Sequence, residues 1–247
     1  MTPVHAVAVA AATFHEGGGE EPDTLPQREV TVSAYQISTM ETSVAEFEAF
    51  VAAGAWTHAD WWTQAGWEWA EKHPNGAGAQ ARRSARPDNH PVIAVSWYEA
   101  DAYCRWAGGS LPTEAQWEHA ACGPDAAPYA WGKDDSVDAA WFAEGKGHHL
   151  IAVNTRAVDD DPIARRSPFG LLHTAGNVWE WVADGYDRDA YAAGDAKDPV
   201  GGADSPWKVL RGGSYVNLPS YCTCMHREPA RPEEGRLSAG FRCAWPP

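Results

Sequence analysis

The most regular hydrophobic patterns along the chain follow three capping boxes. In a capping box, a hydroxyl residue is followed three positions later by Glu or Gln, and each side chain binds a free backbone N–H group at a helix start. The three boxes are Ser43 with Glu46, Ser96 with Glu99, and Thr113 with Gln116. Apolar residues follow each box at spacings of three and four, which predicts three short helices with one buried face each. Glycines after each pattern, at 54, 108–109 and 123, predict where the helices end.

Patterns typical of strands are fewer and shorter. Apolar and polar residues alternate over 29–37, which predicts a half-buried strand. Three apolar runs beside glycines predict further strands, at 178–182, 209–210 and 240–244. Loops are predicted for 124–170 and 184–206, and an exposed insertion for 73–90. No internal repeat or linker is evident, so we expect one domain over residues 1–247.

Composition changes this picture in one respect, because large aromatic residues and turn formers are abundant. The chain has 247 residues, of which 14 are Trp, 23 Gly and 18 Pro. Gly and Pro favour turns, and Trp buries a large area per residue. We therefore expect a loop-rich domain in which aromatic packing replaces long helices.

The net charge of −15 and the apolar runs exclude several classes of partner and location. A strongly acidic protein repels phosphate backbones and anionic lipid surfaces, so neither nucleic acid nor a membrane is expected as a partner. No apolar run approaches the roughly 18 residues of a membrane-spanning helix. The longest, over 6–14, has no Lys or Arg before it and does not resemble an export signal. A cytoplasmic location is therefore predicted.

Common catalytic signatures are missing, but four segments resemble one known family. The sequence contains no phosphate-binding P-loop, no zinc-binding His-Glu-x-x-His and no Gly-x-Ser-x-Gly elbow. The four segments lie at 109–119 (GSLPTEAQWEH), 169–181 (FGLLHTAGNVWEW), 209–215 (VLRGGSY) and 240–243 (GFRC). Together, over about residues 25–247, they resemble the formylglycine-generating enzyme (sulfatase-modifying factor) superfamily. The resemblance implies an α+β, C-type-lectin-like fold with little regular secondary structure.

The resemblance also implies calcium at the segment Gly-Asn-Val-Trp-Glu-Trp. Family members bind calcium at this motif, which assigns Asn177 and Glu180 as oxygen ligands. The alternative is that Asn177 only caps a turn. A second family calcium site would fall near Asn154 or the acidic run 159–161, where the flanking residues match less well.

The segment after Arg-Gly-Gly-Ser-Tyr corresponds to the catalytic segment of the family. Members with formylglycine-generating activity have two cysteines five residues apart, which bind Cu(I) as soft thiolates. Copper then activates O₂, and a cysteine of the substrate is oxidised. In this chain, the first position is Asn217 and the second is Cys222. An amide has therefore replaced one thiolate, which argues against the two-cysteine mechanism.

The chain has five cysteines, so at least one thiol is outside any intramolecular disulfide. The resemblance implies disulfides between Cys122 and Cys224 and between Cys104 and Cys243. Cys222 is then left over. Three readings stay open: a nucleophilic or metal-binding thiol, a Cu(I) ligand together with Cys224 if that residue is reduced, or an inert buried thiol.

Two functions follow from these observations. The first is a divergent oxidoreductase that uses O₂ and copper or iron to oxidise a thiol, a peptide or a small molecule. Its candidate catalytic residues are Ser214, Asn217, Tyr221, Cys222 and His226. His226 would lower the pKa of the Cys222 thiol if its ring faces the sulfur. The second function is a non-catalytic, lectin-like scaffold that binds a ligand or protein through the loops over 216–238.

Overall fold

A computed structural model gives the fold and describes residues 5–77, 87–124, 127–132, 155–159, 166–193 and 196–247. All three predicted helices are present: α1 (Val44–Ala52), α4 (Trp97–Trp106) and α5 (Glu114–Cys122). Each begins at its predicted capping box, in which both reciprocal hydrogen bonds form. The predicted helix starts are confirmed because the hydrogen bonds of a capping box involve only residues three apart in the sequence.

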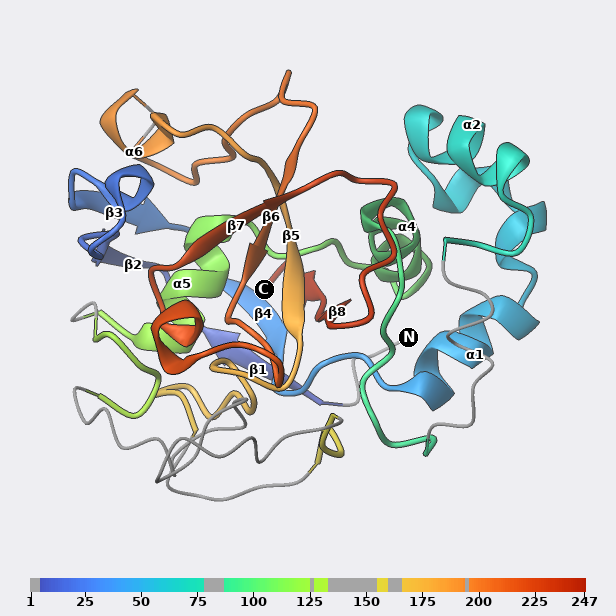
Figure 1. Cartoon of the computed structure of the whole chain (residues 1–247), viewed down its shortest axis with the longest axis horizontal. Coiled ribbons are helices and arrows are strands. Elements are labelled where there is room, and N and C mark those ends of the chain that lie inside the picture. Colours follow the sequence, from blue (N-terminus) through green and yellow to red (C-terminus); the bar gives the residue numbers. More distant parts are fainter. Residues whose placement is uncertain (1–4, 78–86, 125–126, 133–154, 160–165, 194–195) are drawn as a thin grey trace.

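A four-stranded sheet lies between α4 and α5 and runs in the order β7-β6-β5-β8 (Figure 1). Its strands are β5 (Trp179–Gly185), β6 (Lys208–Arg211), β7 (Arg227–Ala230) and β8 (Ala239–Phe241). The β5–β6 and β6–β7 pairs are antiparallel, whereas β5 and β8 are parallel. The predicted apolar runs supply β5, β6 and β8, but β7 was not predicted.

The N-terminal part of the chain forms two smaller sheets. One has the order β1-β4-β9, from strands β1 (Ala6–Val9), β4 (Tyr35–Ser38) and β9 (Ala244–Trp245). The other pairs β2 (Ala12–Glu16) with β3 (Arg28–Val32). The single strand predicted over 29–37 is therefore divided between two sheets. The division falls at Ser33, whose N–H and Oγ both donate to the Asp198 carboxylate, at 2.6 and 2.7 Å.

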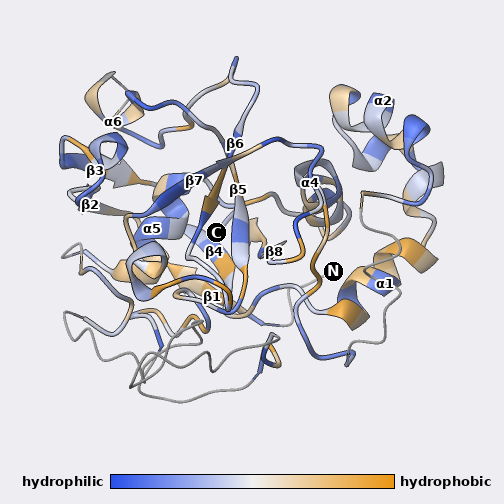
Figure 2. Cartoon of the chain, in the orientation of Figure 1, coloured by the Kyte–Doolittle hydropathy of each residue, from blue (hydrophilic) through white to orange (hydrophobic). Residues whose placement is uncertain are grey.

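The remaining elements are short. Helix α2 (Gln64–Lys72) begins at Thr63, and α6 (Ala190–Ala193) is a single turn within a segment predicted as loop. Within the described residues, four 3-10 turns cover Pro22–Thr24, Ala55–Thr57, Ala59–Trp61 and Pro219–Cys222. Hydrophobic residues dominate α1, whereas α2 is mostly polar (Figure 2). Of the predicted insertion over 73–90, residues 78–86 lie outside the described residues, and the predicted loop over 124–170 is described only in part.

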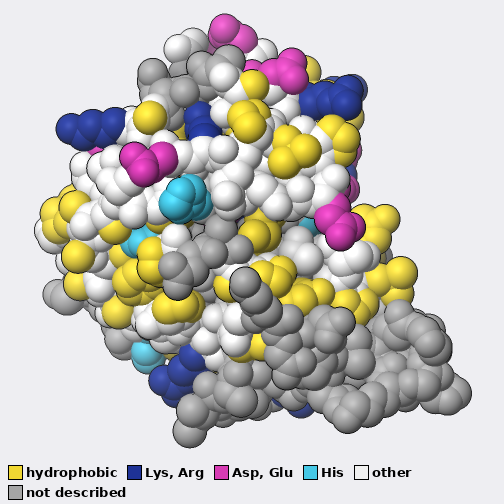
Figure 3. Space-filling view, turned by 90° about the vertical axis from the view of Figure 1, so that its left-hand side faces the viewer, with side chains coloured by type: hydrophobic (Ala, Val, Ile, Leu, Met, Phe, Trp, Pro, Cys, Tyr) yellow, Lys and Arg dark blue, Asp and Glu magenta, His cyan; other side chains and the backbone are white. Residues whose placement is uncertain are grey.

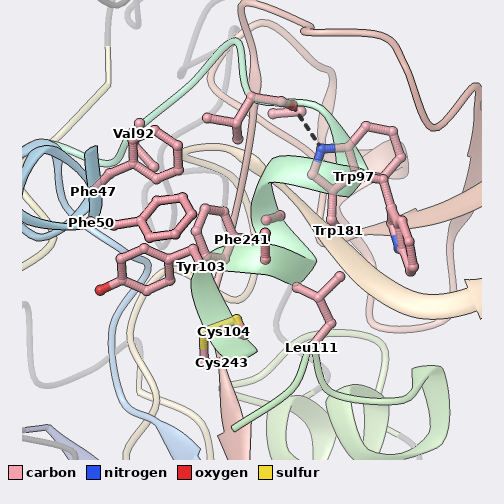
Figure 4. Packing of buried hydrophobic residues seen from close by; sticks show 14 of the residues in the cluster. Phe47, Phe50, Val92, Trp97, Tyr103, Cys104, Leu111, Trp181, Phe241 and Cys243 are labelled. Carbon is pink, nitrogen blue, oxygen red and sulfur yellow. Dashed lines mark hydrogen bonds between the residues drawn. A yellow bond between two sulfur atoms is a disulfide. The ribbon is translucent and has the colours of Figure 1, made fainter. Parts of the chain in front are cut away.

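The main core lies between α1, α4 and the central sheet, and it is largely aromatic. Phe47, Phe50, Tyr103 and Phe241 pack with ring centroids 5.2–6.3 Å apart (Figure 4). The Cys104–Cys243 disulfide lies at the edge of this cluster. On the face that carries β2, β3 and α6, hydrophobic side chains form scattered groups with charged residues of both signs between them (Figure 3). None of the helices formed by the described residues is both long and apolar enough to cross a membrane.

Candidate functional site

The predicted site residues lie on the chain segment that leaves β6. Two consecutive glycines, Gly212 and Gly213, follow the strand with φ values of 89° and 72°, which favour glycine over residues with a Cβ. A Cβ on Gly213 would collide with the Cys222 side chain. The segment therefore folds back so that Cys222 packs against the backbone of Gly213.

Ser214 and Asn217 are joined by hydrogen bonds within this segment. The buried Ser214 hydroxyl donates to Asn217 Oδ1, and the backbone N–H of Asn217 donates to the Ser214 carbonyl at 3.0 Å. The next residue, Tyr215, donates its N–H to the Asn177 carbonyl at 2.9 Å. The Asn217 side chain thus closes a tight turn beside the Gly-Gly-Ser sequence.

Cys222 is a free thiol with no exposed surface. Burial raises its pKa far above the usual range for cysteine, because the apolar surroundings disfavour the thiolate. The thiol donates to the Leu218 carbonyl, with 3.7 Å between Sγ and the oxygen, and it also has a backbone hydrogen bond with Ser214. The thiol packs in a small cluster with Tyr129 and Ala175. In this arrangement it is neutral, and a neutral thiol is a poor nucleophile and a poor metal ligand.

Tyr221 and His226 lie together at the edge of the segment. Their ring centroids are 5.0 Å apart, and Tyr221 is 43% exposed. The His226 ring also lies 5.7 Å from the ring of Trp179, the first Trp of the Asn-Val-Trp-Glu-Trp motif. His226 Nδ1 is 3.2 Å from a carboxylate oxygen of Glu21.

The condition under which His226 would activate Cys222 is therefore not met. The imidazole binds Glu21, and the effect that dominates the pKa of the thiol is burial, which raises it. Glu21 and Trp179 are members of the site that sequence reasoning missed. Trp179 was within a quoted motif, but Glu21 is 205 residues from His226 and no sequence spacing points to it.

The described residues do not fit a two-thiolate Cu(I) site. Asn217 offers a neutral amide, and the other four cysteines form the Cys104–Cys243 and Cys122–Cys224 disulfides that the resemblance implied. Cys224 is thus unavailable to pair with Cys222. No group of three or more His, Cys, Asp or Glu side chains within the described ranges is arranged to hold a metal ion.

The calcium assignment gains no support from the geometry. Both oxygens of Glu180 bind the Arg242 guanidinium, at 2.6 and 2.7 Å, and one also accepts from the Trp117 indole. Asn177 Oδ1 accepts from the Arg156 N–H at 2.8 Å, which uses one of its two lone pairs. Asn177 also has a φ of 63°, which suits the alternative reading of a turn residue. Calcium therefore stays a prediction. Asn154 and residues 160–161 lie outside the described residues.

A second buried polar cluster lies on the same side of the sheet as Glu180, against α5. Arg211 and Arg227 both bind Glu114, with N–O distances of 2.6 and 2.7 Å. Arg211 also binds Glu118 at 2.6 Å. The Leu-Pro-Thr-Glu segment thus has a structural role, because its Glu114 joins α5 to β6 and β7.

Comparisons with known proteins place the whole chain in one family. Residues 2–247 match the family described as sulfatase-modifying factor enzyme 1-like domain. The formylglycine-generating enzyme of Streptomyces coelicolor is 39% identical, over 82% of this chain and 68% of its own length. The hercynine oxygenase of Mycobacterium tuberculosis is 30% identical, over 92% of this chain and 57% of its own length.

Solved structures confirm the predicted α+β fold. Treponema denticola variable protein 1 matches with a TM-score of 0.74 and 21% identity, over 98% of this chain and 95% of that one. PvdO from Pseudomonas aeruginosa matches with a TM-score of 0.67 and 21% identity, over 98% and 94%. At these identities the likeness shows the fold alone. The kinship with C-type lectins stays an expectation.

Proposed function

Because this chain belongs to the sulfatase-modifying factor family, we propose that it is a divergent oxidoreductase that oxidises a thiol, peptide or small-molecule substrate with O₂. Its relatives include proteins named formylglycine-generating enzyme and hercynine oxygenase. The observation that supports the proposal is the position of Cys222. Cys222, which the resemblance assigns as the second cysteine of the family pair, is buried and packs against Gly213, next to Ser214 in the Gly-Gly-Ser turn.

The reaction proposed here differs from the two-thiolate copper reaction. Position 217 contributes an amide whose oxygen is engaged by Ser214, so no step is assigned to a copper ion. The residues themselves offer substrate contacts: the Asn217 amide nitrogen as a donor, the exposed Tyr221 ring as an apolar surface, and His226 as an imidazole. The proposal includes copper or iron as a cofactor, and the experiment below measures whether either metal is needed.

The substrate surface is proposed to lie over residues 216–221, which we call the site loop. Six large apolar side chains are exposed among the described residues, and three of them lie in this short segment. They are Val216, Leu218 and Tyr221, with 54%, 50% and 43% of their surfaces exposed. The other three, Leu25, Val200 and Leu237, are separated along the chain. Clustered exposed apolar side chains are typical of binding surfaces.

Oxygen consumption in the presence of a cysteine-containing peptide tests the proposal. We expect O₂ uptake and loss of peptide thiol by the wild type, measured without added metal and after loading with Cu(I) or Fe(II). Leu218→Ser should weaken peptide binding by about five- to tenfold, because it removes one apolar contact. Leu25→Ser changes a leucine of similar exposure (47% against 50%) outside the loop and is the matched control. Uptake that is the same with and without peptide would contradict the proposal.

A second candidate function is favoured by the burial of the thiol. A fully buried Cys222 with a strongly raised pKa suits a protein that binds ligands through the site loop and performs no redox step. Cys222→Ser separates the two candidates. A scaffold keeps its full peptide affinity in this variant and shows no peptide-dependent O₂ uptake in either form, whereas an oxidoreductase that uses the thiol loses its uptake.

A further inference from the structure

His226 is a buried side chain that uses only half of its hydrogen-bonding capacity. Its Nδ1 lies 3.2 Å from Glu21 Oε1, and the side chain is 10% exposed. Its Nε2 is buried and has no hydrogen-bond partner among the described residues. Buried polar atoms are almost always satisfied, so an unsatisfied one indicates a functional role or a missing ligand.

The contact with Glu21 decides which nitrogen holds the proton of the neutral ring. A carboxylate only accepts hydrogen bonds, so Nδ1 must be the N–H donor. Nε2 then presents a lone pair and is a proton acceptor. The pair therefore has the arrangement of a general base that a second residue orients.

Two aromatic neighbours show where this imidazole lies. Glu180 pairs with Arg211, and Arg211 with Arg227, and all three side chains point toward α5. Trp179 precedes Glu180 in β5 and therefore points to the opposite face of the sheet. His226 thus lies between the buried ring of Trp179 and the exposed ring of Tyr221.

Glu21 is held in place by the residues that follow it. Thr24 donates both its N–H and its hydroxyl to the Glu21 carbonyl, at 3.0 and 2.7 Å. Arg227, the neighbour of His226, donates to the Asp23 carbonyl at 3.0 Å. Both members of the pair are therefore fixed to the start of β7. This anchoring makes Glu21 a positioning residue for the ring.

We propose that Glu21 and His226 form a dyad in which His226 Nε2 takes the proton of a thiol ligand bound against Tyr221. The S–H bond of the ligand breaks, an N–H bond forms at Nε2, and the sulfur keeps the electron pair as a thiolate. The resulting imidazolium still directs Nδ1–H at the Glu21 carboxylate. This proposal rests on the proposed function, because it takes the thiol substrate and the site loop from it. It does not require the thiol of Cys222.

Nitrogen NMR of the histidine rings tests the dyad without reference to activity. At about pH 8, where an ordinary imidazole is neutral, we expect the wild type to show a protonated Nδ1 and an unprotonated Nε2 at His226. Glu21→Ala should give a mixture of tautomers, whereas Glu21→Gln, which keeps an acceptor oxygen, should retain the single form. Glu20→Ala removes a neighbouring exposed carboxylate and is the matched control.

The acceptor role is tested by adding N-acetylcysteine amide to the same samples. In the wild type, saturating ligand should move the Nε2 signal to the protonated form, and Glu21→Ala should need about five- to tenfold more ligand. The exposed His58 is the internal control.

Each contrary result removes a defined part of the proposal. A protonated Nε2 in the wild type, or identical tautomers in Glu21→Ala and Glu20→Ala, overturns the dyad. Ligand-induced shifts at Tyr221 without a change at Nε2 overturn the acceptor role and leave the proposed binding surface standing. If the ligand shifts no signal, both the acceptor role and the proposed thiol substrate are overturned, while the tautomer comparison still decides whether Glu21 orients the ring.

Discussion

Residue 217 is where this sequence departs from the pattern that the family resemblance implies. The resemblance places a cysteine at this position, and here it is an asparagine whose side-chain oxygen accepts from Ser214. The hydrogen bonds between Ser214 and Asn217 close a turn over 214–217. We therefore expect this chain to lack the two-thiolate metal site that the resemblance implies for the family.

Asn217→Cys should restore tight Cu(I) binding, because it recreates two cysteines five residues apart. We expect one Cu(I) per chain, bound at least about tenfold more tightly than by the wild type, measured anaerobically by competition with a chromophoric chelator. The loss of the bond to Ser214 should lower the free energy of unfolding of the metal-free protein by about 0.5–1.5 kcal/mol. Ser220→Cys adds a thiol to the same loop at another spacing and should leave the affinity unchanged. Equal affinities for the two variants would refute the role given to position 217.

The site could be predicted from the sequence only where its parts are close together in the chain. Counting from the Gly-Gly-Ser motif located Asn217 and Cys222, and the family resemblance implied the disulfides that leave Cys222 free. The resemblance could not show that Arg242 occupies both oxygens of Glu180, because that contact depends on how β5 and β8 pair. The Glu21–His226 contact could not be predicted from the sequence either, because the two residues are 205 positions apart and only tertiary folding brings them together.

At the scale of elements, the turn between β6 and the site loop depends on its second glycine. Gly213 and Gly108 both have positive φ values, 72° and 81°, so alanine is strained at either position. A Cβ at Gly213 would also collide with Cys222, whereas at Gly108 it would meet nothing within 4 Å. We therefore expect Gly213→Ala to cost about 1–3 kcal/mol more in unfolding free energy than Gly108→Ala, measured by urea denaturation. Similar losses in the two variants would show that the thiol does not pack tightly there.

Elements with local start signals were predicted well, and elements defined by their partners were not. The three capping boxes located α1, α4 and α5 because their hydrogen bonds are local. Strand β7 contains Arg, Glu and Pro and has no apolar alternation, yet it pairs with β6 and buries Arg227 against Glu114. No strand is predicted over the apolar run 6–14, although in the structure this run forms β1 and most of β2. Ion pairing and edge positions in sheets override the patterns on which such predictions depend.

At the scale of the whole molecule, the buried charges join the N-terminal segment, α5 and the central sheet. Arg211 has no exposed surface and binds Glu114, Glu118 and the Cys224 carbonyl. Arg211→Met should lower the unfolding free energy by about 3–5 kcal/mol, because it leaves buried carboxylates without their partner. Arg105→Met breaks the half-exposed pair with Asp101 and should cost no more than about 1 kcal/mol. Urea denaturation compares the two, and equal losses would contradict the importance assigned to the buried cluster.

The same cluster makes stability depend on pH, and the direction follows from its excess of acidic groups. Burial and the nearby carboxylates of Glu118 and Glu114 raise the pKa of Glu16 from 4.5 to about 8. Burial, with a further contribution from Glu114, raises the pKa of Asp184 from 3.8 to about 7. A raised pKa means that the folded state holds a proton that the unfolded state has released. The stability from these two groups is therefore complete below about pH 4 and is lost as the pH rises through 7 and 8.

Glu114 has the opposite dependence, since Arg227 and Arg211 outweigh its burial and lower its pKa to about 2. Its contribution is lost only as the pH falls below about 4.5. Glu16→Gln removes the group whose raised pKa destabilises the folded wild type as the pH rises. The unfolding free energy of this variant, relative to that of the wild type, should therefore increase steadily between pH 5 and 8, by up to about 1.4 kcal/mol per pH unit. Glu20→Gln, which neutralises an exposed neighbour, should follow the wild type throughout. Parallel curves for Glu16→Gln and the wild type in urea denaturation would show that Glu16 is ionised in the folded protein, and that Arg28, 2.8 Å away, outweighs its burial.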